Sequence, residues 1–191
     1  MERVHALEFR YPPGGPDALL ARFESLRRRA VIVGAEGSGK STLLALLAAR
    51  FGMSGQPVRR FAVRPGEKAA THLFALLREM EPRELLLLDG FDHLSRWARF
   101  VLLRRATRLG GLLATSHRTE RTLPTLIRLV PSVELLRDLA GDLVGEEAEA
   151  VDLAEIHRRH EGNLRTALRE LYDLWAARDE SVRYAQGNVI R

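Results

Sequence analysis

The chain has 191 residues, of which 46% are hydrophobic and 29% are charged, and this composition fits a folded domain and excludes broad disorder. Its net charge of +5 is carried almost entirely by arginines in short scattered clusters, which leaves nucleic acid open as a partner without establishing it. There is no cysteine, so disulfides and thiolate metal sites are excluded. The N-terminus lacks an apolar signal-peptide core and no aliphatic run could span a bilayer, so we expect a cytoplasmic protein.

Up to about residue 137, short apolar runs alternate with amphipathic segments. Strands that are apolar on both faces are typical of a parallel sheet covered by helices. We predict five strands, preceded by an edge strand at 4–10, and four helices. The predicted strands are 30–33, 58–63, 85–88, 112–115 and 132–136, and the helices are 17–28, 40–50, 69–80 and 95–109.

After Asp138 the pattern changes to helices without intervening strands, at 138–144, 151–160 and 164–177. The sequence therefore predicts an α/β fold with a three-layer αβα core at 1–137 and a mostly parallel five-stranded sheet. A small C-terminal helical lid at 138–178 follows. Because residues 179–191 have weak periodicity, we expect them to form a flexible tail.

A glycine-rich loop lies between the strand at 30–33 and the helix at 40–50, and it matches the Walker A pattern Gly-x-x-x-x-Gly-Lys-Ser in full. Glycines let the backbone N–H groups point inward, and the helix adds the positive end of its dipole. Lys40 should reach the β- and γ-phosphates of a nucleoside triphosphate, and Ser41 should supply a ligand to Mg²⁺. The predicted phosphate-binding residues are Gly34, Ala35, Glu36, Gly37, Ser38, Gly39, Lys40, Ser41 and Thr42.

The apolar run at 85–88 is followed by Asp89, which matches the Walker B pattern. A buried strand would place this carboxylate beside the phosphate loop, where it can bind Mg²⁺ directly or through water. Many P-loop ATPases have a water-activating Glu next, but here the residue is Gly90. Asp92 is the nearest other carboxylate. It could polarise the attacking water or cap the helix that begins near Ser95, and we favour the cap.

The strand at 112–115 leads into Thr115-Ser116-His117, which brings polar side chains to the same edge of the sheet. Any of them could hydrogen-bond the γ-phosphate, and His117 could also orient water. An ordinary strand-to-loop transition is the alternative. Arg118 and Arg121 follow, and each could contact phosphate, serve as an arginine finger or be surface charge.

The segment Gly162-Asn163 predicts a break and a cap before the last long helix. Arg165 lies in the first turn of that helix, where the helix dipole disfavours a cation. A nucleotide phosphate would satisfy this arginine, and a solvated side chain is the alternative. Phe9 or Tyr11 could stack on a base, although their positions alone support neither strongly.

Together these motifs resemble those of AAA+ and STAND-type P-loop ATPases, over roughly residues 28–178. Gly162-Asn163-Leu164-Arg165 is similar to the sensor-2 motif of that family. The resemblance implies ATP and Mg²⁺ as ligands, contact of Arg165 with the nucleotide, lid movement that remodels a partner, and frequent self-association. No guanine-reading Asn-Lys-x-Asp motif occurs. The sequence departs from the family in lacking the Walker B Glu and an identifiable arginine finger, and the chain is short.

We therefore predict a Mg²⁺-dependent ATPase or ATP-dependent switch that acts on a protein or DNA partner, with slow or partner-dependent turnover. The predicted catalytic residues are Lys40, Asp89, Asp92, Ser116, His117 and Arg165, and the predicted metal ligands are Ser41 and Asp89. One alternative is a small-molecule kinase, with Asp92 as the base and Arg118 and Arg121 in its lid. Another is a nucleotide-binding scaffold with little turnover.

Overall fold

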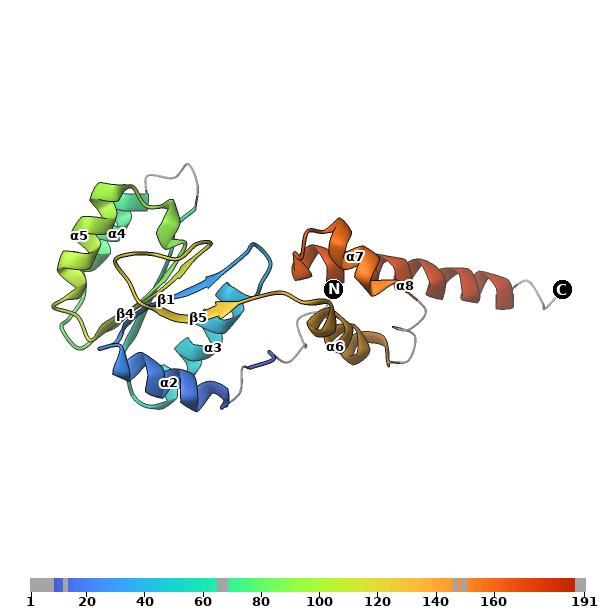
Figure 1. The fold of residues 1–191 in the computed structure, drawn as a ribbon, viewed down its shortest axis with the longest axis horizontal. Coiled ribbons are helices and arrows are strands. Elements are labelled where there is room, and N and C mark those ends of the chain that lie inside the picture. The colour runs from blue at the N-terminus through green and yellow to red at the C-terminus, as the bar shows by residue number, and fades with distance from the viewer. Residues whose placement is uncertain (1–8, 12–13, 65–68, 146–147, 149–150, 188–191) are drawn as a thin grey trace. The chain divides into compact units, whose positions relative to one another are not determined.

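The computed structural model describes residues 9–11, 14–64, 69–145, 148 and 151–187. The chain divides into two compact units, and the division falls between Val130 and Pro131. The predicted boundary after residue 137 lies inside a helix. Figure 1 shows a sheet with helices in the N-terminal unit and helices alone in the C-terminal unit, and each unit is described by itself.

The N-terminal unit is built on a five-stranded sheet with the strand order β2-β3-β4-β1-β5. Every neighbouring pair of strands is parallel, so the predicted α/β fold with a five-stranded sheet is confirmed. Because β4 lies between β1 and β3, three strand ends that carry polar residues lie next to one another. The strands are β1 (Arg29–Gly34), β2 (Val58–Ala62), β3 (Leu85–Asp89), β4 (Gly111–Ser116) and β5 (Thr125–Leu129).

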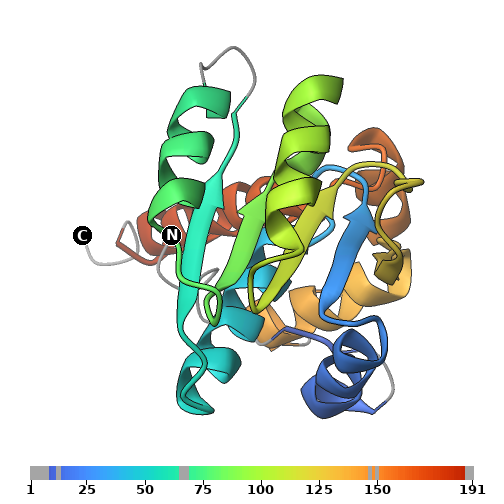
Figure 2. The same cartoon turned by 90° about the vertical axis from the view of Figure 1, so that its left-hand side faces the viewer.

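Helices cover both faces of this sheet, as Figure 2 shows, with α4 and α5 on one side and α2 and α3 on the other. The alternation of side chains along the central strands produces the two cores. In β3, Leu86 and Leu88 pack toward α4 and α5, whereas Leu85 and Leu87 pack toward α2 and α3. The helices are α2 (Gly15–Ser25), α3 (Lys40–Met53), α4 (Ala69–Glu79) and α5 (Arg96–Ala106), with a short 3₁₀ helix η1 (Phe91–His93) after β3.

The predicted fifth strand at 132–136 is wrong, because the fifth strand is β5, which pairs with β1. The side chain of Ser132 instead accepts a hydrogen bond from Leu135 N at 3.1 Å and so caps helix α6 (Val133–Val144). A serine followed by apolar residues at helical spacing favours a helix once its hydroxyl satisfies a free N–H. Of the predicted edge strand at 4–10, residues 4–8 lie outside the described part of the chain.

The C-terminal unit contains α6, α7 (Leu153–Arg159) and α8 (Leu164–Gly187) around an apolar core of its own. Asn163 Oδ1 accepts a hydrogen bond from Thr166 N at 3.3 Å, and Gly162 has a φ of 77°. These two features confirm the predicted break and cap. Helix α8 continues past the predicted end at residue 177. Within the described residues, no helix combines the length and the apolar character needed to cross a membrane.

The cap at Ser132 makes a testable contribution to the C-terminal unit. We expect Ser132→Ala to lower the free energy of unfolding of this unit by about 1 kcal/mol, because one N–H of the first helical turn loses its partner. Urea unfolding followed by the fluorescence of the buried Trp175 in a Trp97→Phe background measures the change. Ser54→Ala, on an exposed residue of the other unit, is the control, and equal stability of the two variants would contradict the assignment.

Candidate functional site

The loop between β1 and α3 has the backbone of an anion-binding loop. Gly37 and Gly39 have φ values of 70° and 88°, in the left-handed region that glycine adopts without strain. Gly39 is the N-cap of α3 and provides no side chain to cap it. The N–H groups of the first turn of α3 are therefore available to an anion at the positive end of the helix dipole.

Two polar side chains of this loop fit a bound phosphate. Lys40 is only 7% exposed, and its Nζ donates to Gly34 O at 2.9 Å and to Ala35 O at 2.7 Å. Ser38 is 6% exposed, and its hydroxyl has no hydrogen-bond partner among the described residues. Leaving a buried hydroxyl unpaired is costly, and a phosphate oxygen would satisfy it. The other predicted loop side chains Ala35, Glu36, Ser41 and Thr42 are exposed.

Two aromatic rings lie beside this loop. A Cβ placed on Gly39 would lie 3.3 Å from the ring of Phe9. Phe9 also contacts Tyr11 edge to face, with ring centroids 5.1 Å apart. The aromatic pair is therefore adjacent to the predicted phosphate site, where a base could stack on it.

Asp89 ends β3, and a threonine on the neighbouring strand fixes its carboxylate. Thr115 Oγ1 donates to Asp89 Oδ1 at 2.5 Å and accepts from Gly90 N at 2.9 Å. Thr115 is almost fully buried, so this geometry is shielded from water. The predicted Mg²⁺ ligand Asp89 is thus oriented by a hydrogen bond from β4, the strand that lies between it and the phosphate loop.

The backbone at Gly90 leaves no room for the glutamate that often follows this aspartate. Its φ is 90°, and a Cβ at this position would lie 2.6 Å from the carbonyl oxygen of Val63. Any side chain here would be strained and would collide with backbone. A glutamate directly after Asp89 is therefore incompatible with this backbone.

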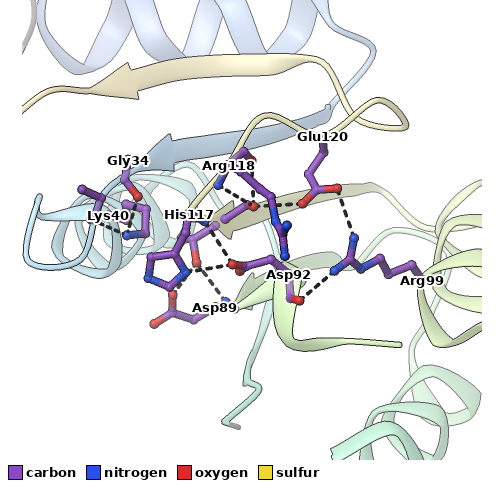
Figure 3. A network of polar contacts seen from close by, with 12 residues as sticks. Gly34, Lys40, Asp89, Asp92, Arg99, His117, Arg118 and Glu120 are labelled. Atoms are coloured by element: carbon purple, nitrogen blue, oxygen red, sulfur yellow. Dashed lines mark hydrogen bonds and ion pairs between the residues drawn. The ribbon is translucent and has the colours of Figure 1, made fainter. Parts of the chain in front are cut away.

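The buried Asp92 side chain pairs with the exposed His117 at the same edge of the sheet, shown in Figure 3. Asp92 Oδ2 accepts from His117 Nδ1 at 2.8 Å and from His117 N at 3.3 Å. The Asp92 side chain is 7% exposed. Burial alone would raise the pKa of Asp92, but the hydrogen bonds from His117 and its charge outweigh it, so the pKa lies below the usual 3.8. The preference for Asp92 as a helix cap is wrong, because Ser95 caps α5 by accepting from Ala98 N at 3.2 Å.

Two residues that the motifs did not reveal fix this pair in place. Arg99 Nη2 donates to Asp92 O at 2.7 Å, and Nη1 donates to Glu120 Oε2 at 3.3 Å. Its guanidinium also lies 5.2 Å from the ring centroid of Phe91. Arg99 thereby ties η1 to the loop after β4 (Figure 3). Neither Arg99 nor Glu120 belongs to a sequence motif, so no pattern could have found them.

Ser116 and Arg165, both predicted to contact nucleotide, lie in different settings. Ser116 is fully buried, and its hydroxyl donates to Glu120 Oε1 at 2.9 Å or to Arg118 O at 2.8 Å. It therefore stabilises the loop that carries His117. Arg165 is an exposed residue in the first turn of α8, in the C-terminal unit. Contact of either side chain with nucleotide stays a prediction.

Near the end of β3, three side chains are spaced so that they could hold a metal ion. Asp92, His93 and His117 each offer a ligand atom, and these atoms lie within 4.8 Å of one another. Carboxylate and imidazole donors at this spacing suit a divalent transition metal. Ser41 and Asp89 present the oxygen ligands that Mg²⁺ prefers.

The depressed pKa of Asp92 predicts a pH-dependent contribution to stability. Its folded-state pKa lies below 3.8, so the contribution is complete above about pH 5 and disappears as pH falls through the folded-state pKa. We expect Asp92→Asn to be less stable than the wild type at pH 6, and the difference to shrink at pH 3. Urea unfolding at both pH values measures it. The exposed Asp138→Asn is the control, and a pH-independent difference would contradict the prediction.

Comparison with known proteins supports the fold. No protein-family model matches this chain, and no curated protein matches it in sequence. Among solved structures, RuvB of Thermotoga maritima, a Holliday junction branch migration motor, is similar with a TM-score of 0.53 and 16% identity, over 82% of this chain and 59% of that chain. A DNA replication initiation factor is similar with a TM-score of 0.59 and 15% identity, over 94% of this chain and 66% of that chain. The RuvB chain is thus matched over about three fifths of its length.

These identities are low enough that the similarity concerns the fold alone. The all-parallel sheet with β4 between β1 and β3 occurs together with a glycine-rich loop after β1 and an aspartate at the end of β3. The fold of this chain is therefore similar to that of these two proteins, and its all-parallel five-stranded sheet with flanking helices matches the AAA+ core.

Proposed function

We propose that this protein binds ATP with Mg²⁺ at the loop between β1 and α3 and hydrolyses it to drive or switch an action on a macromolecular partner. The observation that carries the proposal is the loop itself. Within the part of the chain that the structure describes, it presents a buried ammonium group, a helix N-terminus with no side-chain cap and a buried hydroxyl with no hydrogen-bond partner. Each of these groups is stabilised by a phosphate.

The neighbouring strand ends supply the remaining groups that hydrolysis needs. Ser41 and Asp89 would bind Mg²⁺, which neutralises charge on the phosphates. Thr115 orients the Asp89 carboxylate through its hydroxyl. Phe9 and Tyr11, next to Gly39, would stack on adenine.

The Asp92–His117 pair supplies the water-orienting function in place of the glutamate that Gly90 excludes. When Nδ1 of His117 donates to the Asp92 carboxylate, Nε2 is left as a proton acceptor. In the proposed step, the oxygen of water bonds to the γ-phosphorus and the bond to the ADP oxygen breaks. Nε2 of His117 accepts the proton of the water, and Asp92 stabilises the imidazolium that forms.

The geometry supports this reading over a small-molecule kinase. A kinase would use Asp92 as a base toward an acceptor hydroxyl, but this carboxylate is buried and is engaged by His117. The fold similarity to a branch migration motor and to a replication initiation factor also supports a macromolecular partner.

Steady-state ATP hydrolysis by the purified protein with Mg²⁺ tests the proposal. It is measured alone, with single-stranded DNA, with duplex DNA and with a panel of small phosphate acceptors. Hydrolysis without an acceptor, or hydrolysis stimulated by DNA, is the expected result. Phosphate transfer that requires a small acceptor would favour the kinase, and ATP binding without turnover under every condition would favour the scaffold.

A further inference from the structure

The outer face of α5 exposes two large aromatic side chains. Trp97 is 66% exposed and Phe100 is 62% exposed, although each has a large apolar surface. Helix α5 lies with α4 on one side of the sheet (Figure 2), and its opposite, buried face carries Ala98, Leu102 and Ala106. The two aromatic rings are therefore not part of the core.

These rings share their face of the helix with arginines. Positions 97, 100 and 104 are separated by three and four residues, so Trp97, Phe100 and Arg104 lie along one face. From Trp97 to Arg104 the helix rises about 10 Å along its axis. The ring of Phe74 in α4 contacts Trp97 edge to face, with centroids 5.3 Å apart and an interplanar angle of 87°. This contact restricts the indole while leaving it exposed.

The charge along this segment has one sign. Between Arg96 and Arg108 there are five arginines and no acidic residue. Arg99 forms an ion pair with Glu120. Among the described residues, the side chains of the other four arginines form no hydrogen bond or ion pair. Arg96 also lies in the first turn of α5, where the helix dipole disfavours a cation. On the adjacent α4, the exposed charged or titratable groups are His72, Arg78 and Glu79.

We propose that a surface formed by Trp97, Phe100 and Arg104 on α5 and by Arg108 in the turn that follows it, called here the α5 face, binds single-stranded nucleic acid. Exposed flat rings stack on unpaired bases, and unpaired arginines bind phosphates. A stretch of about 10 Å matches roughly three stacked nucleotides at 3.4 Å each. A duplex would satisfy the arginines but would keep its base faces covered. Single-stranded nucleic acid would then be the macromolecular partner of the ATPase proposed above. Only the coupling of nucleic-acid binding to ATP rests on that proposed function.

Trp97 itself reports the binding. In a Trp175→Phe background it is the only tryptophan, because the chain has two, and the buried Trp175 indole has no hydrogen bond to lose among the described residues. Oligothymidylate of about 20 nucleotides, longer than a typical site of ~4–16, should quench its fluorescence saturably. Oligouridylate of equal length tests RNA, and a duplex of equal length should quench far less. Trp97→Phe, which leaves Trp175, should show no quenching.

Variants of the α5 face test the two aromatic rings singly and the two arginines together, by fluorescence anisotropy of labelled oligothymidylate. Phe100→Ala and Trp97→Ala should each weaken binding about 5- to 150-fold, the loss expected for one stacked base. Arg104→Ala with Arg108→Ala should reduce the slope of log affinity against log salt by roughly 1 to 2. Arg50→Ala and Met53→Ala are matched controls, because both residues are exposed on α3 across the sheet, and they should bind like the wild type.

The titrations are made without nucleotide and are repeated in the Lys40→Met variant. Failure of ATP binding would therefore leave the test of the α5 face intact, and failure of the α5 face would leave ATP binding unaffected. The proposal is overturned if the folded protein shows no quenching by single strands, or if the controls weaken binding as much as Phe100→Ala. It is also overturned if polyglutamate quenches Trp97 as strongly as oligothymidylate, because the surface would then suit an acidic protein.

Discussion

Replacing Lys40 with methionine should lower the rate of ATP hydrolysis by roughly 10²- to 10³-fold, the loss expected when one pre-positioned charged donor is removed. Lys40 is the single lysine of the phosphate loop, and its ammonium group is already directed into it by the carbonyl oxygens of Gly34 and Ala35. Methionine keeps most of the apolar stem and removes the charge. Steady-state release of phosphate with Mg²⁺ measures the effect.

Arg50→Met is the matched control for this variant. It removes a cation from the same helix at an exposed position near its other end, and its hydrolysis should equal that of the wild type. Thermal unfolding of both variants establishes that they are folded. If folded Lys40→Met hydrolyses ATP at the wild-type rate, the loop between β1 and α3 is not the catalytic phosphate site.

Replacing His117 with alanine should lower kcat by about 10²- to 10⁴-fold, the range for losing a general base, while ATP affinity stays close to that of the wild type. Asp92 acts through His117 as a positioning residue, because its carboxylate accepts from Nδ1. Asp92→Asn should therefore lower kcat as well, and adding it to His117→Ala should produce little further loss. The pH profile of kcat in Asp92→Asn should be shifted relative to the wild type.

His93→Ala is the control for this pair. The rings of His93 and His117 have centroids 5.6 Å apart, but the hydrogen bonds of Asp92 come from His117 and not from His93. His93→Ala should hydrolyse ATP at nearly the wild-type rate. Wild-type turnover in His117→Ala, or losses in the double variant that equal the product of the single losses, would exclude the proposed role of the pair.

The sequence predicted those parts of the site that depend on local order along the chain. In the loop at 34–41 and in the run ending in Asp89, the predicted site residues follow directly after a strand, so a local sequence pattern is enough to locate them. The parallel sheet followed from strands that are apolar on both faces. The hydrogen bond between Thr115 and Asp89 then follows from β3 and β4 being neighbours, which no local pattern specifies.

The features that the sequence did not reveal depend on tertiary contacts. The segment at 125–129 pairs with β1, whereas the segment at 132–136 forms a helix because Ser132 can cap it. Asp92 lies three residues before Ser95, which caps α5, and only the fold brings His117 to its carboxylate. The links through Arg99 join three segments separated along the chain, and no motif spans them.

The measurement that tests the central claim most directly is the equilibrium binding of ATP in the presence of Mg²⁺, by isothermal titration calorimetry of the wild type and Lys40→Met. We predict saturable binding of one ATP per chain by the wild type, and binding by the folded variant that is weakened severely or lost. Absence of binding by the folded wild type, or equal affinity of the two proteins, would contradict the assignment of the loop between β1 and α3 as the ATP site.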